Sequence, residues 1–368
     1  MERNKAKRYN NTKLILSIAE GGISLIFIIW LLFSGASATI AQYAASWVCN
    51  PYLQLFVFLL MIGFFNSVVT FPVSFYKDYL LEHKYELSNQ SLRKYFWEKF
   101  KGLLVALPIV LILMAVFYFL LRRYPENWWV IMGTVIVLFS VILSRLAPTL
   151  IFPLFYKFTK LENDELKEKI ESLCQSVGME LDGLYQFDMS KNTKKANAAF
   201  TGIGKTKRII LGDTLLNNLS DEQILAVLSH ELGHFKLNHI WKGMTAGVLL
   251  NYLGLYLVDL IYSGAYSQFG SNKYSLAALP LMAILLSLFS IITGPLTNML
   301  SRKHEREADD FAVDLMQEKR SLKTGLKKLS DQNLGDEKPH PVVEFLFYSH
   351  PSTGSRIQRL GGLDEEPA

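Results

Sequence analysis

Two histidines and a glutamate lie within five consecutive residues, close enough to share one metal ion. Residues 230–234 read His-Glu-Leu-Gly-His. On a helix of about 3.6 residues per turn, positions i and i+4 lie on one face, so His230 and His234 can hold an ion together. Glu231 is rotated by about 100° from His230, so it lies beside the ion and can take a proton from an attacking water molecule. This pattern is typical of zinc proteases; the alternative is a surface helix with two spare histidines.

A third ligand must come from another part of the chain, because catalytic zinc takes three protein ligands and keeps one position open. Residues 304–309 read His-Glu-Arg-Glu-Ala-Asp. Glu305 and Asp309 share a helical face. Glu305 can therefore bind a single Zn²⁺ ion per chain, while Asp309 accepts a hydrogen bond from the ring N–H of a ligand histidine. His304 and Glu307 are rival ligands for the same ion.

Six apolar segments are long enough to cross a membrane, which requires about 20 apolar residues. Of the whole chain, 50% is hydrophobic and 19% is charged, below the roughly 25% charged residues of average soluble domains. The sequence predicts a mainly α-helical integral membrane protein. Its spans are expected at residues 14–33, 53–71, 103–121, 128–146, 241–261 and 276–298.

The distribution of lysine and arginine predicts the orientation, since basic loops stay in the cytosol. Basic residues precede the first span, separate spans two and three, and follow span six; the opposite loops carry only Arg122, Arg123 and Lys273. Both termini and the active site are therefore expected in the cytosol. The membrane would be the cell membrane in a bacterium or the endoplasmic reticulum in a eukaryote. A cleaved signal peptide ending near Ala38 is the rival interpretation of the N-terminus.

The segments between the spans predict a small cytosolic domain and no nucleotide or nucleic-acid partner. We divide the chain into a membrane domain at 1–157 with four spans, a cytosolic insertion at 158–219 with a small β-sheet, the zinc-binding helices with spans five and six at 220–316, and a C-terminal cytosolic segment at 317–368. The β-like runs are 184–189, 198–203 and 208–211. The glycines near Lys205 lack the spacing of a phosphate-binding loop. The sequence also contains no basic stripe with interleaved aromatic residues of the kind that binds a nucleic acid.

The zinc-binding helix has a clear start. Ser220 is a good N-cap, and Gln223 completes a capping box. No proline follows before span five, so the motif and the span are expected to form one continuous helix. On such a helix His239 would point away from the ion and would have a structural role.

Several motifs together resemble the CAAX prenyl protease family, type I endoproteases that trim prenylated C-terminal tails. The likeness covers nearly the whole chain and is strongest at residues 229–239, 197–202, 301–309 and 349–356. The resemblance implies that Glu305 is the third ligand and that His350 and Arg356 face the scissile bond. It also implies that the strand carrying Asn197, Ala198 and Phe200 lies beside the peptide. A histidine or arginine can stabilise an oxyanion, and an edge strand can bind an extended peptide.

The resemblance also implies a helical bundle that encloses a water-filled chamber. Family members usually have seven spans and this chain starts where their second would lie, so closure of the ring stays open. His304 stands where the family usually has a bulky or neutral residue, and it could compete for the metal.

The expected function is a membrane-embedded zinc metalloendopeptidase that cleaves near the C-terminus of CAAX-type peptides, prenylated or not. Its expected partners are a peptide or protein substrate, with or without an attached lipid, and membrane lipid. One alternative is a heat-shock-type membrane quality-control protease with the same zinc chemistry. Another is a catalytically idle scaffold or transporter subunit, which the intact set of His230, Glu231, His234 and Glu305 argues against.

Overall fold

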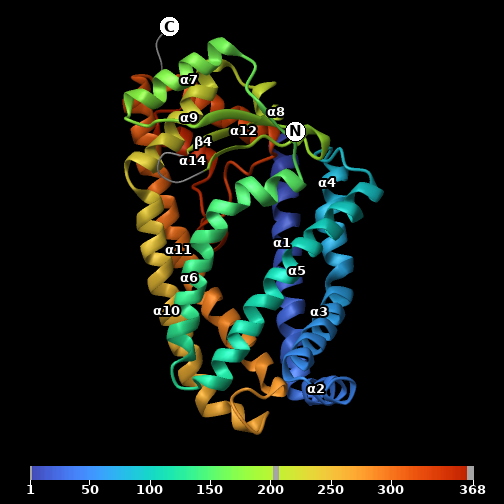
Figure 1. The fold of residues 1–368 in the computed structure, drawn as a ribbon. Helices are drawn as coiled ribbons and strands as arrows, with labels where there is room; N and C mark the ends of the chain where they lie inside the picture. The colour runs from blue at the N-terminus through green and yellow to red at the C-terminus, as the bar shows by residue number, and fades with distance from the viewer. Residues whose placement is uncertain (1, 202–206, 363–368) are drawn as a thin grey trace.

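Long helices dominate the protein (Figure 1). The computed structural model describes residues 2–201 and 207–362. Six helices within these ranges are long and apolar enough to cross a membrane, and the six predicted spans coincide with them. They are α1 (Glu2–Phe33), α3 (Pro51–Phe75), α5 (Leu92–Arg123), α6 (Trp128–Leu146), α10 (His239–Ala265) and α11 (Leu279–Met316).

These six helices form a closed ring. Contacts lead from α1 to α3, then to α5, α6, α10 and α11, and α11 packs back against α1. In five of the six, at most 17% of the most apolar stretch is buried, whereas a helix in a solid bundle buries a whole apolar stripe. Most of the apolar side chains of these five helices are therefore not packed against other described residues. The bundle encloses a chamber, and its ring closes with six spans.

The ring is tightest at the end opposite the sheet (Figure 1). There the short helix α2 (Ala36–Trp47) follows Gly35, whose φ of 78° is a left-handed conformation that glycine adopts without strain. Trp128 and Tyr262 are almost completely buried in an apolar core with Leu55 and Leu121. This core joins the ends of several spans and fixes their spacing.

At the other end, a four-stranded sheet lies beside short helices and near the start of α1 (Figure 1). The strand order is β1-β2-β4-β3, with β2 and β4 parallel and the outer pairs antiparallel. The strands are β1 (Phe158–Lys160), β2 (Gly183–Phe187), β3 (Ala198–Thr201) and β4 (Arg208–Gly212). The last three confirm the predicted runs as far as they are described, and β1 was not predicted. The end of the run 198–203 and the glycines near Lys205 lie outside the described residues.

Helices cover the sheet and complete the cytosolic unit. Ile209 and Leu211 of β4 are buried in one apolar cluster with residues of α7 and α9. The helices of this end are α4 (Leu81–Lys84), α7 (Asp164–Ser176), α8 (Asp213–Leu216), α9 (Asp221–Lys236), α12 (Arg320–Gln332), α13 (Pro341–Phe347) and α14 (Thr353–Arg359).

The helix that carries the histidine motif starts as predicted but ends earlier. The Ser220 hydroxyl accepts a hydrogen bond from the Gln223 N–H, and the Gln223 side chain accepts one from the Ser220 N–H, so the capping box is confirmed. The predicted continuous helix into span five is wrong. Asn238 has a left-handed φ of 58°, and α10 begins at His239. Asparagine is one of the few residues that tolerate this conformation, so the chain can break without a proline or glycine.

Candidate metal centre

The centre exists because α9 and α11 approach each other closely. A Cβ atom on Gly233 would lie 3.0 Å from the Ala308 Cα atom and 3.2 Å from the Phe311 Cβ atom. Ala308 is itself completely buried. Two very small residues therefore let the histidine turn of α9 lie against residues 305–309 of α11. Sequence reasoning assigned no role to either residue, although a small residue within each of the two ligand motifs was a usable signal.

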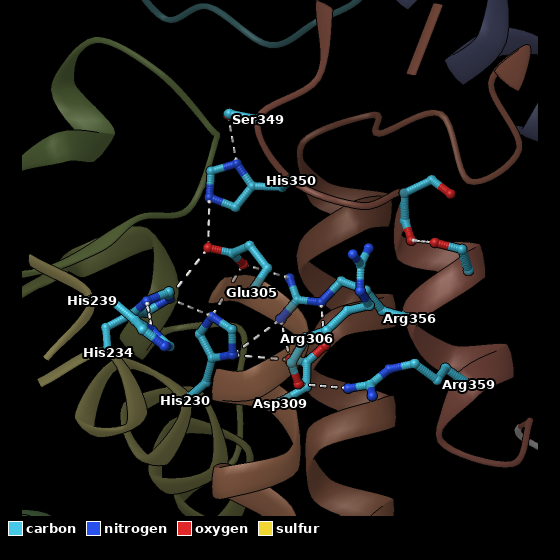
Figure 2. Close-up of polar contacts among 12 residues, drawn as sticks. His230, His234, His239, Glu305, Arg306, Asp309, Ser349, His350, Arg356 and Arg359 are labelled. Carbon is cyan, nitrogen blue, oxygen red and sulfur yellow. Dashed lines mark hydrogen bonds and ion pairs between the residues drawn. The ribbon is translucent and has the colours of Figure 1, made fainter. Parts of the chain in front are cut away.

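Three predicted ligands converge on one point (Figure 2). The Nε2 atoms of His230 and His234 are 3.3 Å apart, and each lies 3.2 Å from a carboxylate oxygen of Glu305. Ligand atoms about 2.0–2.1 Å from a tetrahedral zinc ion would be separated by about 3.4 Å. The triangle therefore has the size of a zinc site.

The chemistry of these atoms also fits a metal. Glu305 Oε2 is buried and has no hydrogen-bond partner among the described residues. Such an atom is costly unless a cation or hydrogen bond compensates it. Two imidazoles with one carboxylate are a donor set of catalytic zinc sites. These residues are therefore better explained as the ligands of a zinc ion than as a hydrogen-bonded cluster that binds no ion.

Asp309 and Arg356 orient the ring of His230 on the side of its Nδ1 atom, away from the triangle. The His230 Nδ1–H group donates to Asp309 Oδ1 over 2.9 Å, the contact that the sequence predicts. Arg356, from α14, donates through Nε to Asp309 Oδ2 over 2.9 Å and through Nη2 to Oδ1. Burial opposes a charge on His230, but the nearby carboxylates of Asp309 and Glu305 outweigh it, so the pKa of His230 is raised. The ring orientation is therefore fixed before any ion binds.

His350 and Arg356 occupy opposite sides of Glu305 (Figure 2). The His350 Nε2 atom lies 3.3 Å from Glu305 Oε1, and its side chain is 63% exposed. Arg356 is buried, and its Nη1 atom lies 3.7 Å from Glu305 Oε2. His350 is thus at the open side of the centre, whereas Arg356 is mainly engaged with Asp309 and can offer only Nη1 to another group.

The remaining predicted residues lie around this triangle in different settings. Glu231 follows His230 on α9 and is half-buried. Strand β3 is at the edge of the sheet. Ala198 and Phe200 pack against the apolar cluster beneath it, and Asn197 is exposed. The backbone of β3, more than its side chains, is therefore available to a peptide.

His239 is where the sequence did not place it. Because α9 ends at Lys236, His239 turns back, and its Nδ1 atom lies 3.1 Å from His234 Nδ1. Its Nε2–H group donates to Glu307 Oε2 over 2.9 Å, and its ring stacks on that of His304. The prediction that His239 points away is wrong, and the rival ligands His304 and Glu307 gather around His239 instead of the triangle.

Two family models divide the chain between them. The model described as peptidase family M48 matches residues 160–364, which contain the metal centre. The model described as "CAAX prenyl protease N-terminal, five membrane helices" matches residues 2–157. That segment holds four of the six long helices together with α2.

Relatives match both parts at once. The "Uncharacterized metalloprotease YhfN" of Bacillus subtilis is 31% identical over 367 residues, 98% of this chain and 86% of the relative. CAAX prenyl protease 1 of Saccharomyces cerevisiae is 32% identical over 333 residues, 85% of this chain and 73% of the relative. The crystal structure of S. mikatae Ste24p has a TM-score of 0.89 at 28% identity, and the match covers 98% of this chain and 89% of that one.

Proposed function

This chain belongs to peptidase family M48, and we propose that it is a zinc endopeptidase that cleaves CAAX-type peptides near their C-termini, with or without a prenyl group. It is a membrane metalloendopeptidase by family and by its six long apolar helices. The observation that carries the finer proposal is the triangle of His230, His234 and Glu305, whose ligand atoms lie 3.2–3.3 Å apart.

His230, His234 and Glu305 would hold the zinc ion. When bound, zinc acts as a Lewis acid that polarises the scissile carbonyl and makes a water molecule easier to deprotonate. Asp309 keeps the Nε2 atom of His230 directed at the triangle, because it accepts the proton of Nδ1. Arg356 in turn holds Asp309 through two hydrogen bonds, so we assign it mainly a positioning role.

Glu231 would be the general base. It accepts the proton of the attacking water and later donates it to the leaving amine, a role that contributes about 10²–10⁴-fold in rate. His350 is exposed beside Glu305, where its ring N–H can donate to the oxyanion. The edge strand β3 would pair with an extended peptide through main-chain hydrogen bonds at Ala198 and Phe200. Asn197 precedes β3 and its carbonyl accepts a hydrogen bond from the Gly212 N–H, so it would contact the peptide through its exposed side chain.

The name of the S. cerevisiae relative, CAAX prenyl protease 1, supports the choice of substrate. The test is a cleavage assay on the purified protein in detergent. Its substrates are a farnesylated CAAX peptide, the same peptide without lipid, and casein. We expect both peptides to be cut near the C-terminus and a chelator to abolish the cleavage. Cleavage of casein alone would replace the proposal with a quality-control protease.

The variant Glu231→Gln tests the mechanism in the same assay. We expect a loss of about 10²–10⁴-fold in rate, with one zinc ion per chain retained by metal analysis. The matched control is Glu222→Gln, an exposed glutamate in the first turn of the same helix, which should behave like the parent protein. Full activity of Glu231→Gln would refute the assigned base.

We also propose that both termini and the metal centre face the cytosol. The basic segments that favour the cytosol adjoin the end of the bundle that carries the sheet (Figure 1). Cys49 is exposed between α2 and α3 at the opposite end, whereas Cys174 is buried in α7. Burial raises the pKa of the Cys174 thiol to about 11, which makes it unreactive toward maleimides at neutral pH.

The two cysteines therefore report sidedness. A membrane-impermeant maleimide added outside intact bacterial cells that express the protein should label Cys49, and Cys174→Ser should give the same signal. Cys49→Ser should remove it. Labelling that requires permeabilised cells would reverse the proposed orientation.

A further inference from the structure

A second group of metal-binding side chains lies beside the candidate metal centre. Ligand atoms of His239, His304 and Glu307 all lie within 4.8 Å of one another. We propose that this His239 cluster is a second site for a divalent transition metal such as zinc, and that its occupation weakens metal binding at the first site. Two imidazoles and a carboxylate suit zinc and its neighbours, whereas calcium and magnesium require oxygen ligands.

The two histidines of the cluster are already held in place. His239 and His304 are only 4% and 8% exposed. Their rings are stacked with centroids 4.2 Å apart and planes inclined by 8°. His239 begins α10 and His304 lies on α11, so each ring is fixed by a helix. Within the part of the chain that is described, no hydrogen bond engages the ring nitrogens of His304, which leaves them available to an ion.

Glu307 gives the cluster access to solvent. Its side chain is 37% exposed, and its Oε2 atom lies 2.9 Å from His239 Nε2. The nearest competing charge is Lys303, whose Nζ atom lies 3.8 Å from Glu307 Oε1 and whose side chain is 67% exposed. An ion pair this exposed contributes little to stability, so Lys303 can move aside. Its positive charge nevertheless makes this site weaker than the first.

The coupling between the sites follows from the single proton that each neutral imidazole carries. The inference rests on the proposed function in this step alone, where His234 Nε2 is a ligand of the first metal. The proton of His234 is then on Nδ1 and is donated to His239 Nδ1, 3.1 Å away. The proton of His239 must then be on Nε2, where it is donated to Glu307.

A metal ion bound to His239 Nε2 would displace that proton to Nδ1. The Nδ1–H groups of His234 and His239 would then face each other. The two Nδ1 atoms are only 3.1 Å apart, a distance at which one of them must act as a hydrogen-bond acceptor. Either a ring rotates or one ion leaves. Binding at the two sites is therefore antagonistic, and by linkage each ion weakens the other by the same factor.

The test is a zinc titration of the full-length, metal-stripped protein in detergent, followed by equilibrium dialysis and metal analysis. We expect two equivalents in the parent protein, the second at least about tenfold weaker than the first, in line with ordinary coupling energies. Glu307→Gln and His304→Phe should each bind one equivalent, with the tight site retained. Excess zinc should inhibit the parent protein and should not inhibit these two variants.

Two further variants separate this inference from the proposed function. Glu305→Gln should lose the tight equivalent and bind zinc more firmly at the His239 cluster, whether or not the protein cleaves CAAX peptides. His340→Asn is the matched control, because His340 caps α13 through its ring nitrogen and asparagine is also a good cap; it should bind two equivalents. A single equivalent in the parent protein would overturn the second site. Two equivalents with undiminished affinity at the first would overturn the coupling.

Discussion

The triangle of His230, His234 and Glu305 and the His239 cluster have the same donor set and come from the same stretches of α9–α10 and α11. They differ in what surrounds the donors. In the triangle, Asp309 fixes the ring of His230, and the Glu305 side chain is 5% exposed. In the His239 cluster, the carboxylate of Glu307 is open to solvent and close to Lys303.

This difference shows that the donor residues alone do not determine how tightly a metal is held. Outer partners that orient the ligands contribute about 10–100-fold in affinity, and burial prevents water from competing for the ion. The comparison therefore ranks the two sites before any ion is considered, and four sets of substitutions can break or sharpen that ranking.

Glu305→Gln should have the largest effect. The neutral amide replaces the one anionic ligand of the triangle. Loss of a residue that only orients a ligand lowers metal affinity by about 10–100-fold, so we expect zinc affinity at the tight site to fall by more than this factor. Peptide cleavage should disappear. The matched substitution on the same helix, Glu307→Gln, should keep the tight ion. Metal analysis after dialysis measures both. Equal zinc loss in the two variants would show that the ranking is wrong.

Asp309→Asn should weaken the tight site by about 10–100-fold. The amide cannot carry the charge that Arg356 and the ring of His230 both contact. Asp310→Asn is the control, because Asp310 is an exposed neighbour that pairs with Arg359. Competition with a zinc chelator gives the affinities. An unchanged affinity in Asp309→Asn would mean that the orientation of His230 does not depend on this carboxylate.

Gly233→Ala should act on the spacing of the helices. The added methyl group would meet the backbone of Ala308, which cannot move as a side chain can. Overpacking of this kind costs about 1–3 kcal/mol and should widen the triangle. Gly243→Ala on α10, where no atom lies within 4 Å of the added Cβ, is the control. Thermal unfolding with and without zinc should show a lower transition only for Gly233→Ala.

The sequence predicted much of this centre because its features are local. Helical spacing placed His230 beside His234 and Glu305 beside Asp309, and the apolar segments gave the six spans. The contacts between distant segments were not accessible in the same way. The approach of α9 to α11 depends on the space left by Gly233 and Ala308, and the three-residue strand β1 is too short to show a pattern.

The position of His239 was predicted wrongly for a related reason. Proline and glycine are the usual signals of a helix end, and neither occurs between His234 and His239. The signal was Asn238, which tolerates the left-handed conformation better than other non-glycine residues. The consequence is large, because this single residue decides whether His239 points into the membrane span or back at His234.

The smallest effect should come from Asn238 itself. Asn238→Gly should keep the break, since glycine adopts positive φ without strain. Asn238→Val should cost about 1–2 kcal/mol, because a β-branched side chain clashes in the left-handed conformation. Thermal unfolding measures the cost. The valine variant should also favour a continuous helix that carries His239 away from His234 and Glu307. Zinc titration of the same variant should then show the second equivalent weakened and the tight site preserved. A second equivalent that survives in Asn238→Val would mean that packing against His304, and not the break in the helix, holds His239 in place.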